Sequence, residues 1–382
     1  MHWRGHSDRM EQLAVYGDVV SDVLGELRQR AEAAMSAGVD PRRIVLDPGL
    51  GFAKNRDDNW ALLRALPQFV ERFARIERLQ MGGGAQYLSH LLRALDGGID
   101  EAVRAAANAD VIVLAIGESQ KMSGEAQSRT EIVVPAPQMA LVDAMAALNK
   151  PMVILLRNGR ALALEGNVKN AQAVVVTWFL GEQMGHAVAD VIFGDHGPSA
   201  RLPISFPHKS GQQPYSYDHK NTGRPANPDL PVEEYKARYR ETTNTALYPF
   251  GFGLTYGEVV YGPVEMASDQ LPWNGTLDVA VTVTNRGAHP AEELVQLYIH
   301  DRVASLTQPG RLLKDFKRVS LKPGQSAKVT FTLNARQLGF IGADETWRIE
   351  PGLFDVWLAP HAQGGAKATF QLIGPASITD GR

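Results

Sequence analysis

The chain has 382 residues, with 39 Lys and Arg against 42 Asp and Glu, and its net charge of -3 gives no basic face for nucleic acid. Zero cysteines exclude disulfides, thiolate metal sites and a cysteine nucleophile. At roughly 100–200 residues per domain, this length predicts two or three domains. The apolar runs are strand-length, and the polar start lacks a signal-peptide core, so we expect no membrane span and a cytoplasmic location as written.

Charge is distributed unevenly along the sequence. Residues 1–80 hold 24 charged residues, and their basic side chains are 11 Arg and one Lys. The other 302 residues hold 57 charged residues, with 16 Arg and 11 Lys. The difference predicts two pieces of separate origin; the alternative is a charged helical segment in an otherwise uniform protein.

The first eighty residues predict a helix, a strand, a loop and a second helix. Apolar residues recur every four positions between Val15 and Ala31, which favours a helix over 15–34 with one apolar face. A short buried strand is expected over 44–46 and a second helix over 59–78. This order is typical of a β/α barrel, in which Asp47 and Lys54 would lie in a ligand-binding loop after the strand.

Strands then alternate with helices, which predicts an α/β fold with a mostly parallel sheet. The loop over 117–129, directly after the first strand, lies where ligands bind such sheets and is the main candidate site. The expected helices cover 99–107, 136–148 and 184–193, and the expected strands cover 111–116, 152–156 and 173–177.

The sequence becomes rich in Pro, Gly and Tyr over 197–256, where we expect ordered connecting loops. Beyond Trp273, short strands alternate with turn sequences, which predicts an antiparallel β-sandwich. The expected strands cover 277–284, 294–300, 312–321, 328–333 and 354–358.

Two short motifs in the first part resemble dihydropteroate synthase, the folate-pathway β/α barrel. They are Met1-His-Trp-Arg-Gly5 and Asp47-Pro-Gly-Leu-Gly-Phe-Ala-Lys54. The resemblance implies that a carboxylate at Asp47 contacts a pterin ring. Other segments of that family are missing from the sequence, so we interpret residues 1–80 as a fragment with a vestigial pterin motif at Asp47 and Lys54.

Residues 98–375 resemble the carboxyl-terminal half of glycoside hydrolase family 3 β-glucosidases. The motifs that carry this resemblance are Ser123-Gly-Glu-Ala-Gln-Ser-Arg129, Leu156-Arg-Asn-Gly-Arg160, Arg201-Leu-Pro-Ile-Ser-Phe-Pro207 and Tyr248-Pro-Phe-Gly-Phe-Gly253. The resemblance implies an α/β sandwich domain over 99–256 and a fibronectin type III-like domain over 257–376, with a junction over 81–98 behind the 1–80 fragment. Parent proteins of this family are often periplasmic or secreted.

A retaining glycosidase needs two carboxyl groups about 5–5.5 Å apart, one as nucleophile and one as acid/base. By resemblance the acid/base is Glu125, in Ser123-Gly-Glu125. Glu118 is the rival, or a residue that fixes the loop, and Arg129 supports the loop by pairing with a carboxylate or forms a surface ion pair. The family's nucleophile is an aspartate in a Ser-Asp-Trp or similar motif of its amino-terminal barrel, which this sequence does not contain.

These observations predict a truncated, fused β-glucosidase-like protein with weak or no hydrolysis of β-linked glucosides. The alternatives are a non-catalytic scaffold or carbohydrate-contacting module and, third, a pterin-binding folate enzyme. We expect no cofactor and no metal, a β-glucoside or oligosaccharide as ligand, and a homodimer, because the missing barrel would leave apolar surface uncovered.

Overall fold

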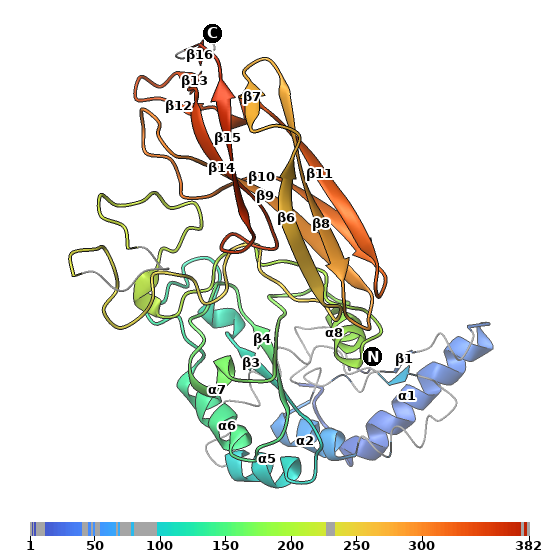
Figure 1. Ribbon diagram of the computed structural model, residues 1–382. Helices are drawn as coiled ribbons and strands as arrows, with labels where there is room; N and C mark the ends of the chain where they lie inside the picture. Colours follow the sequence, from blue (N-terminus) through green and yellow to red (C-terminus); the bar gives the residue numbers. More distant parts are fainter. Residues whose placement is uncertain are drawn as a thin grey trace. The chain divides into compact units, whose positions relative to one another are not determined.

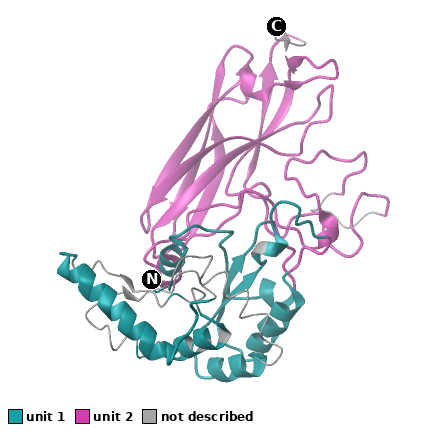
Figure 2. Cartoon of the chain, turned by 180° about the vertical axis from the view of Figure 1, so that it is seen from behind, with its two compact units in different colours: residues 1–129, 134–159, 166–189 teal, residues 130–133, 160–165, 190–382 magenta. Residues whose placement is uncertain are grey.

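The computed structural model falls into two compact units (Figure 2). Unit 1 is formed by 1–129, 134–159 and 166–189, and unit 2 by 130–133, 160–165 and 190–382. No helix in the described part of the chain is long and apolar enough to cross a bilayer. The structure describes residues 2, 4, 12–39, 45–46, 49, 54–65, 68, 78–79, 98–226, 234–375 and 378–379.

Helix α1 (Val19–Ser36) opens the described part of unit 1 (Figure 1). It begins after Asp18, whose carboxylate accepts a hydrogen bond from the backbone N of Ser21. The four-residue apolar period produces its buried face, but Val15 precedes the helix and is 73% exposed, so its predicted inward position is wrong. The buried side chains of this face are Val19, Val23, Leu27 and Ala31.

The predicted strand is found as β1 (Val45–Leu46), which pairs in parallel with β2 (Arg78–Leu79). The second helix, α2 (Arg56–Arg64), ends well before the predicted residue 78, and Arg78 lies in a strand. Pro67 lies inside the stretch predicted as helical, and proline disfavours a helix interior because it lacks the N–H donor.

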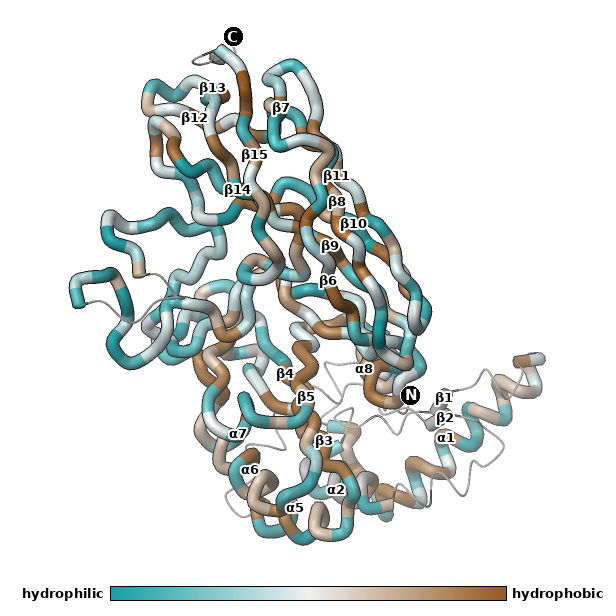
Figure 3. The backbone as a smooth tube through the Cα atoms, viewed as in Figure 1, coloured by the Kyte–Doolittle hydropathy of each residue, from teal (hydrophilic) through white to brown (hydrophobic). Residues whose placement is uncertain are grey.

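The centre of unit 1 is a parallel sheet of β3 (Ile112–Gly117), β4 (Met152–Arg157) and β5 (Ala173–Val176), in that order. Strands β4 and β5 read as near-continuous apolar runs, drawn in brown in Figure 3, as expected of parallel strands in an α/β fold. The helices of this region are α5 (Gly98–Ala106), α6 (Ala136–Ala146), the short α7 (Gly166–Lys169) and α8 (Met184–Phe193). Helix α6 packs against α5, α7 and β3.

The predicted sandwich in unit 2 is confirmed as two sheets with one shared apolar core. One sheet has the order β10-β9-β14-β15-β7 and the other the order β11-β8-β6. Their strands are β6 (Val259–Met266), β7 (Gln270–Pro272), β8 (Thr276–Asn285), β9 (Ala291–Asp301), β10 (Leu312–Leu321), β11 (Ser326–Asn334), β14 (Gly352–Ala359) and β15 (Lys367–Ile373).

Smaller elements complete the two units. A separate three-stranded sheet joins β12 (Phe340–Ile341), β13 (Trp347–Ile349) and β16 (Ile378–Thr379). In the described part of the predicted loop region over 197–256, residues Ser210–Gln212 form a short 3-10 helix, η3. Two further 3-10 helices are η2 (Gln120–Met122) and η4 (Ala335–Leu338).

Asp301, at the end of β9, is a buried carboxyl group that destabilises the folded chain at neutral pH. Burial, and then the nearby charge of Glu350, raise its pKa from 3.8 to about 6, against one hydrogen bond from Val303 N. The unfolded chain therefore ionises Asp301 first, so folded stability falls as the pH rises from about 4 to 6. At about 1.4 kcal/mol per pKa unit, this costs up to about 3 kcal/mol above pH 6.

Replacing Asp301 with Asn is expected to stabilise the chain at pH 7.5 and to leave its stability nearly unchanged at pH 4. Thermal unfolding of the full chain at both pH values measures the difference, with Asp269→Asn as an exposed control. Equal changes at the two pH values would show that the charge of Asp301 is not the cause.

Candidate functional site at the carboxyl edge of the parallel sheet

Strands β3, β4 and β5 end at one edge of their parallel sheet. Pairing runs from Ile112 opposite Met152 to Gly117 opposite Arg157, and β5 follows the same direction. Beyond the strands, the backbone N of Glu118 donates to Arg157 O at 2.7 Å, which extends the ladder by one residue. The loop over 118–129 therefore starts from a fixed point where ligands bind in α/β sheets.

Gly117 is held in place by Gln138 of α6 and by the backbone of Arg157 in β4. Gln138 of α6 clamps its backbone, accepting from Gly117 N at 2.7 Å and donating to Gly117 O at 3.0 Å. The φ of Gly117 is +134°, and a Cβ there would lie 1.8 Å from Arg157 O. Only glycine fits this bend and this close approach.

Glu118 is buried inside the loop that it begins, with a side chain that is 0% exposed. Its Oε1 accepts from Arg129 Nη1 at 2.9 Å, and its Oε2 accepts from the backbone N of Gly159 at 3.3 Å. These contacts join the two ends of the loop to each other and to the turn after β4. The arrangement favours the loop-fixing role for Glu118 and the supporting role for Arg129.

Glu125 lies on the outer turn of the same loop, where its side chain is exposed. Gly124 and Ala126 on either side have positive φ angles, of 126° and 58°. Among the described residues, no donor lies within hydrogen-bonding distance of the Glu125 carboxylate. The loop therefore presents one carboxylate to solvent and holds the other inside.

The middle of the loop packs on the residues after β4 and β5. A Cβ on Gly159 would lie 2.0 Å from Ser123 Oγ and 2.7 Å from Phe179 Cε2. Phe179 itself is 42% exposed, and its ring lies 5.3 Å from the guanidinium carbon of Arg157. Phe179 therefore presents an aromatic surface beside the loop, whereas Trp178 is half-buried.

The two motifs of the first segment meet in the structure through Lys54 and His2. Buried Lys54 donates from Nζ to Gly49 O at 2.9 Å and lies 3.0 Å from His2 Nδ1. The opposite His2 nitrogen, Nε2, lies 2.8 Å from Glu26. Burial, and then the charge of Lys54, lower the pKa of His2 to about 4, so the ring is neutral at pH 7. Asp47 lies outside the described residues.

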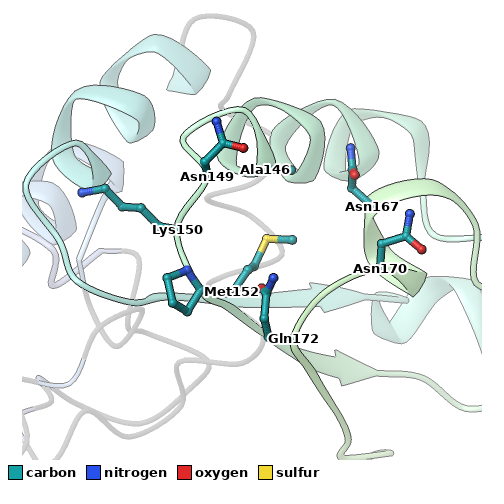
Figure 4. Close-up of a pocket in the computed structure, with 8 residues that line it drawn as sticks. Ala146, Asn149, Lys150, Met152, Asn167, Asn170 and Gln172 are labelled. Carbon is teal, nitrogen blue, oxygen red and sulfur yellow. Dashed lines mark hydrogen bonds between the residues drawn. The ribbon is translucent and has the colours of Figure 1, made fainter.

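A pocket of about 360 Å³ lies at the opposite, amino-terminal edge of the sheet (Figure 4). Carboxamide side chains surround it, and Met152 forms its floor. Lys150, also at its rim, donates to the carbonyl oxygens of Ala106, the last residue of α5, and of Ala109 beyond it. The six-residue strands, at about 3.3 Å per residue, separate this pocket from the 118–129 loop by about 20 Å.

No group of three or more acidic or His side chains that could hold a metal ion occurs among the described residues. The chemistry available at the carboxyl edge is that of an exposed carboxylate, Glu125, on a loop whose base is rigid. A carboxylic acid so placed can donate a proton to a bound ligand, or accept one from it.

The sequence matches two known domain families. Residues 7–256 match the glycosyl hydrolase family 3 C-terminal domain, and residues 293–362 match the fibronectin type III-like domain. The chain is 42% identical over 275 residues to the periplasmic beta-glucosidase of Salmonella typhimurium. The aligned region covers 72% of this chain and 36% of that protein. The chain is 38% identical over 275 residues to a beta-xylosidase of Formosa agariphila, covering 72% and 37% of the two chains.

Solved structures give the same assignment. The beta-glucosidase of Listeria innocua in complex with glucose superposes with a TM-score of 0.69 at 33% identity, covering 73% of this chain and 39% of that one. A mutant of the same enzyme has also been solved with laminaribiose. This chain thus spans little more than a third of the length of these relatives. It belongs to glycoside hydrolase family 3, of which it carries the C-terminal α/β domain and the fibronectin type III-like domain.

Proposed function

We propose that this chain carries the acid/base half of a family 3 β-glycosidase site, with Glu125 as the acid/base and β-linked glucosides as the substrate class. The observation that carries the proposal is that the two glutamates of the 118–129 loop differ in burial. Glu118 is buried against Arg129 and the Gly159 backbone, and this leaves Glu125 as the exposed carboxylate of the loop. The relatives named beta-glucosidase support glucosides as the substrate class, and the relative named beta-xylosidase supports only the wider class of β-linked glycosides.

The second carboxylate of the reaction has no counterpart in the sequence motifs of this chain. A retaining mechanism forms a covalent glycosyl–enzyme intermediate on that second group. Losing one member of a catalytic pair costs orders of magnitude in rate, because attack and proton transfer act together. We therefore propose that the chain by itself hydrolyses β-glucosides weakly or not at all.

The purified chain is expected to release 4-nitrophenol from its β-glucoside at close to the rate in buffer. Glu125→Gln is expected to leave that low rate unchanged, and Glu118→Gln serves as the control for damage to the loop. Release at rates typical of complete glycosidases, abolished by Glu125→Gln, would overturn the proposal of an incomplete site.

For residues 1–80 we propose a segment that resembles dihydropteroate synthase but performs no pterin chemistry. The amino group of Lys54 is already held by Gly49 O and lies against His2, so its contacts are internal. The match of residues 7–256 to the family 3 domain includes most of this segment, and the division at 80, 98 and 256 remains our proposal. Titration with a fluorescent pterin tests the segment, with no saturable binding as the expected result.

A further inference from the structure

Arg157, the last residue of β4, has a cationic side chain with no counter-charge among the described residues. Its Nη1 is buried and has no hydrogen-bond partner in the described part of the chain. No carboxylate of the described residues lies within ion-pair distance of it either, and burial lowers the pKa of its guanidinium. Arg157 is half-buried, and burying one of its guanidinium nitrogens without a hydrogen-bond acceptor is unfavourable, so this nitrogen needs an explanation.

Two other arginines with a buried, unpartnered nitrogen are compensated in a way that Arg157 is not. Arg201 forms an ion pair with Glu293 at 2.9 Å, and Arg348 forms one with Asp344 at 2.5 Å. The carboxylate on the neighbouring strand end, Glu118, already pairs with Arg129. Glu118, the carboxylate at the same edge of the sheet, therefore does not act as the counter-charge of Arg157.

Two further groups at this edge of the sheet suit an oxyanion. Ser119, two residues beyond the Gly117 that pairs with Arg157, has a buried hydroxyl without a partner among the described residues. The Phe179 ring, 5.3 Å from the guanidinium carbon, leaves the N–H groups of the guanidinium edge for an acceptor. A guanidinium binds carboxylate and phosphate oxygens in a two-pronged manner, to which a hydroxyl can add a third hydrogen bond.

We propose that Arg157 and Ser119 form an oxyanion site at the carboxyl edge of the sheet, at the base of the loop that carries Glu125. Because this edge is also the proposed glycoside site, the ligand class is a glycoside with an acidic group, a sugar carboxylate or a sugar phosphate. The inference that the ligand contains a sugar rests on the proposed function. The oxyanion part rests on Arg157 and Ser119 alone.

Thermal unfolding of the full chain, at constant ionic strength set with NaCl, tests the site. Inorganic phosphate and glucuronate are expected to raise the Tm of the wild-type chain, and equimolar glucose is not, because binding to the folded state stabilises it. Arg157→Met is expected to remove the increase given by glucuronate and to reduce that given by phosphate, leaving only the general exclusion effect of phosphate. Arg104→Met, on the exposed side of α5, is the matched control and should keep both increases.

Two further readouts separate binding from a structural role. Without ligand, Arg157→Met is expected to unfold at the same temperature as the wild type or higher, because it removes a desolvated charge. Arg157→Lys keeps the charge but loses the two-pronged geometry, and should raise the Kd for glucuronate at least about tenfold. If Arg157→Met does not fold, the lysine variant still provides the test.

Two results would overturn the inference: no increase in Tm with either oxyanion, or an equal increase in Arg157→Met. An increase with phosphate alone that Arg157→Met reduces would support the sugar phosphate. None of these touches the proposed function, which depends on Glu125 and on β-glucoside hydrolysis. Conversely, the chain could bind oxyanions through Arg157 while Glu125 proves to have no role in hydrolysis. The oxyanion site would then stand, and the proposal that its ligand is a sugar derivative would fail.

Discussion

Gly117→Ala is expected to destabilise the full chain by more than about 3 kcal/mol, or to prevent unit 1 from folding. The added Cβ would lie 1.8 Å from Arg157 O, a backbone atom that cannot move away without breaking the β3–β4 ladder. The φ of +134° adds strain of about 1–3 kcal/mol for any side chain. Urea unfolding followed by circular dichroism measures the loss.

Gly124→Ala is the matched control in the same loop. Gly124 has nearly the same backbone conformation, with φ +126°, but nothing lies within 4 Å of an added Cβ. Its replacement carries the strain of about 1–3 kcal/mol without the collision. Equal losses for the two variants would contradict the close approach of Gly117 to β4.

Glu293→Leu is expected to destabilise the chain by about 3–5 kcal/mol, the range for breaking a buried ion pair. Glu293 and Arg201 lie 2.9 Å apart in unit 2, and their side chains are only 7% and 4% exposed. Removing the carboxylate leaves the Arg201 cation buried, without the anion that offsets its desolvation. The free energy of unfolding in urea measures the change.

The double variant Arg201→Met with Glu293→Leu is expected to recover most of that loss, because it removes both buried charges. Glu265→Gln is the control at an exposed pair, in which Lys328 lies 2.6 Å away and both side chains are about half exposed. It should change the free energy of unfolding little, because solvent screens an exposed pair. A double variant as unstable as the single one would show that packing, and not charge, stabilises this region.

Much of the α/β and β-sandwich architecture could be predicted because its apolar periods are strong. The boundaries of α8 and β10 agree with the expected ranges to the residue, and β4 differs by one. Strand β6 was missed because Gly262 and Pro263 interrupt its pattern. The structure accommodates them where the pairing with β8 shifts register, between Tyr261 and Val264.

The candidate loop could be placed from the sequence, but the roles within it could not. Both Glu118 and Glu125 follow a strand, and only three-dimensional packing separates the buried carboxylate from the exposed one. The clamp of Gln138 on Gly117 joins residues 21 positions apart and leaves no local pattern. The sequence around Arg157 likewise does not indicate that its Nη1 has no partner among the described residues, because such a partner could come from any part of the chain.

Hydrolysis by a hybrid enzyme tests the central claim, that Glu125 is the acid/base of a family 3 site. In this hybrid, residues 98–375 replace the matching part of the Salmonella typhimurium periplasmic beta-glucosidase, the relative at 42% identity. The substrate is 2,4-dinitrophenyl β-glucoside, whose leaving group departs without a proton, so the first step does not need the acid/base. Loss of the acid/base then slows the second step, the attack of water on the glycosyl–enzyme. Azide can attack in place of water because it does not need a base.

We predict that Glu125→Gln lowers the turnover of the hybrid by about 10²–10⁴-fold. Azide should then restore the rate, with β-glucosyl azide as the product, and should not restore a Glu118→Gln hybrid. Unchanged turnover in the Glu125→Gln hybrid, or azide rescue at Glu118 instead, would contradict the account.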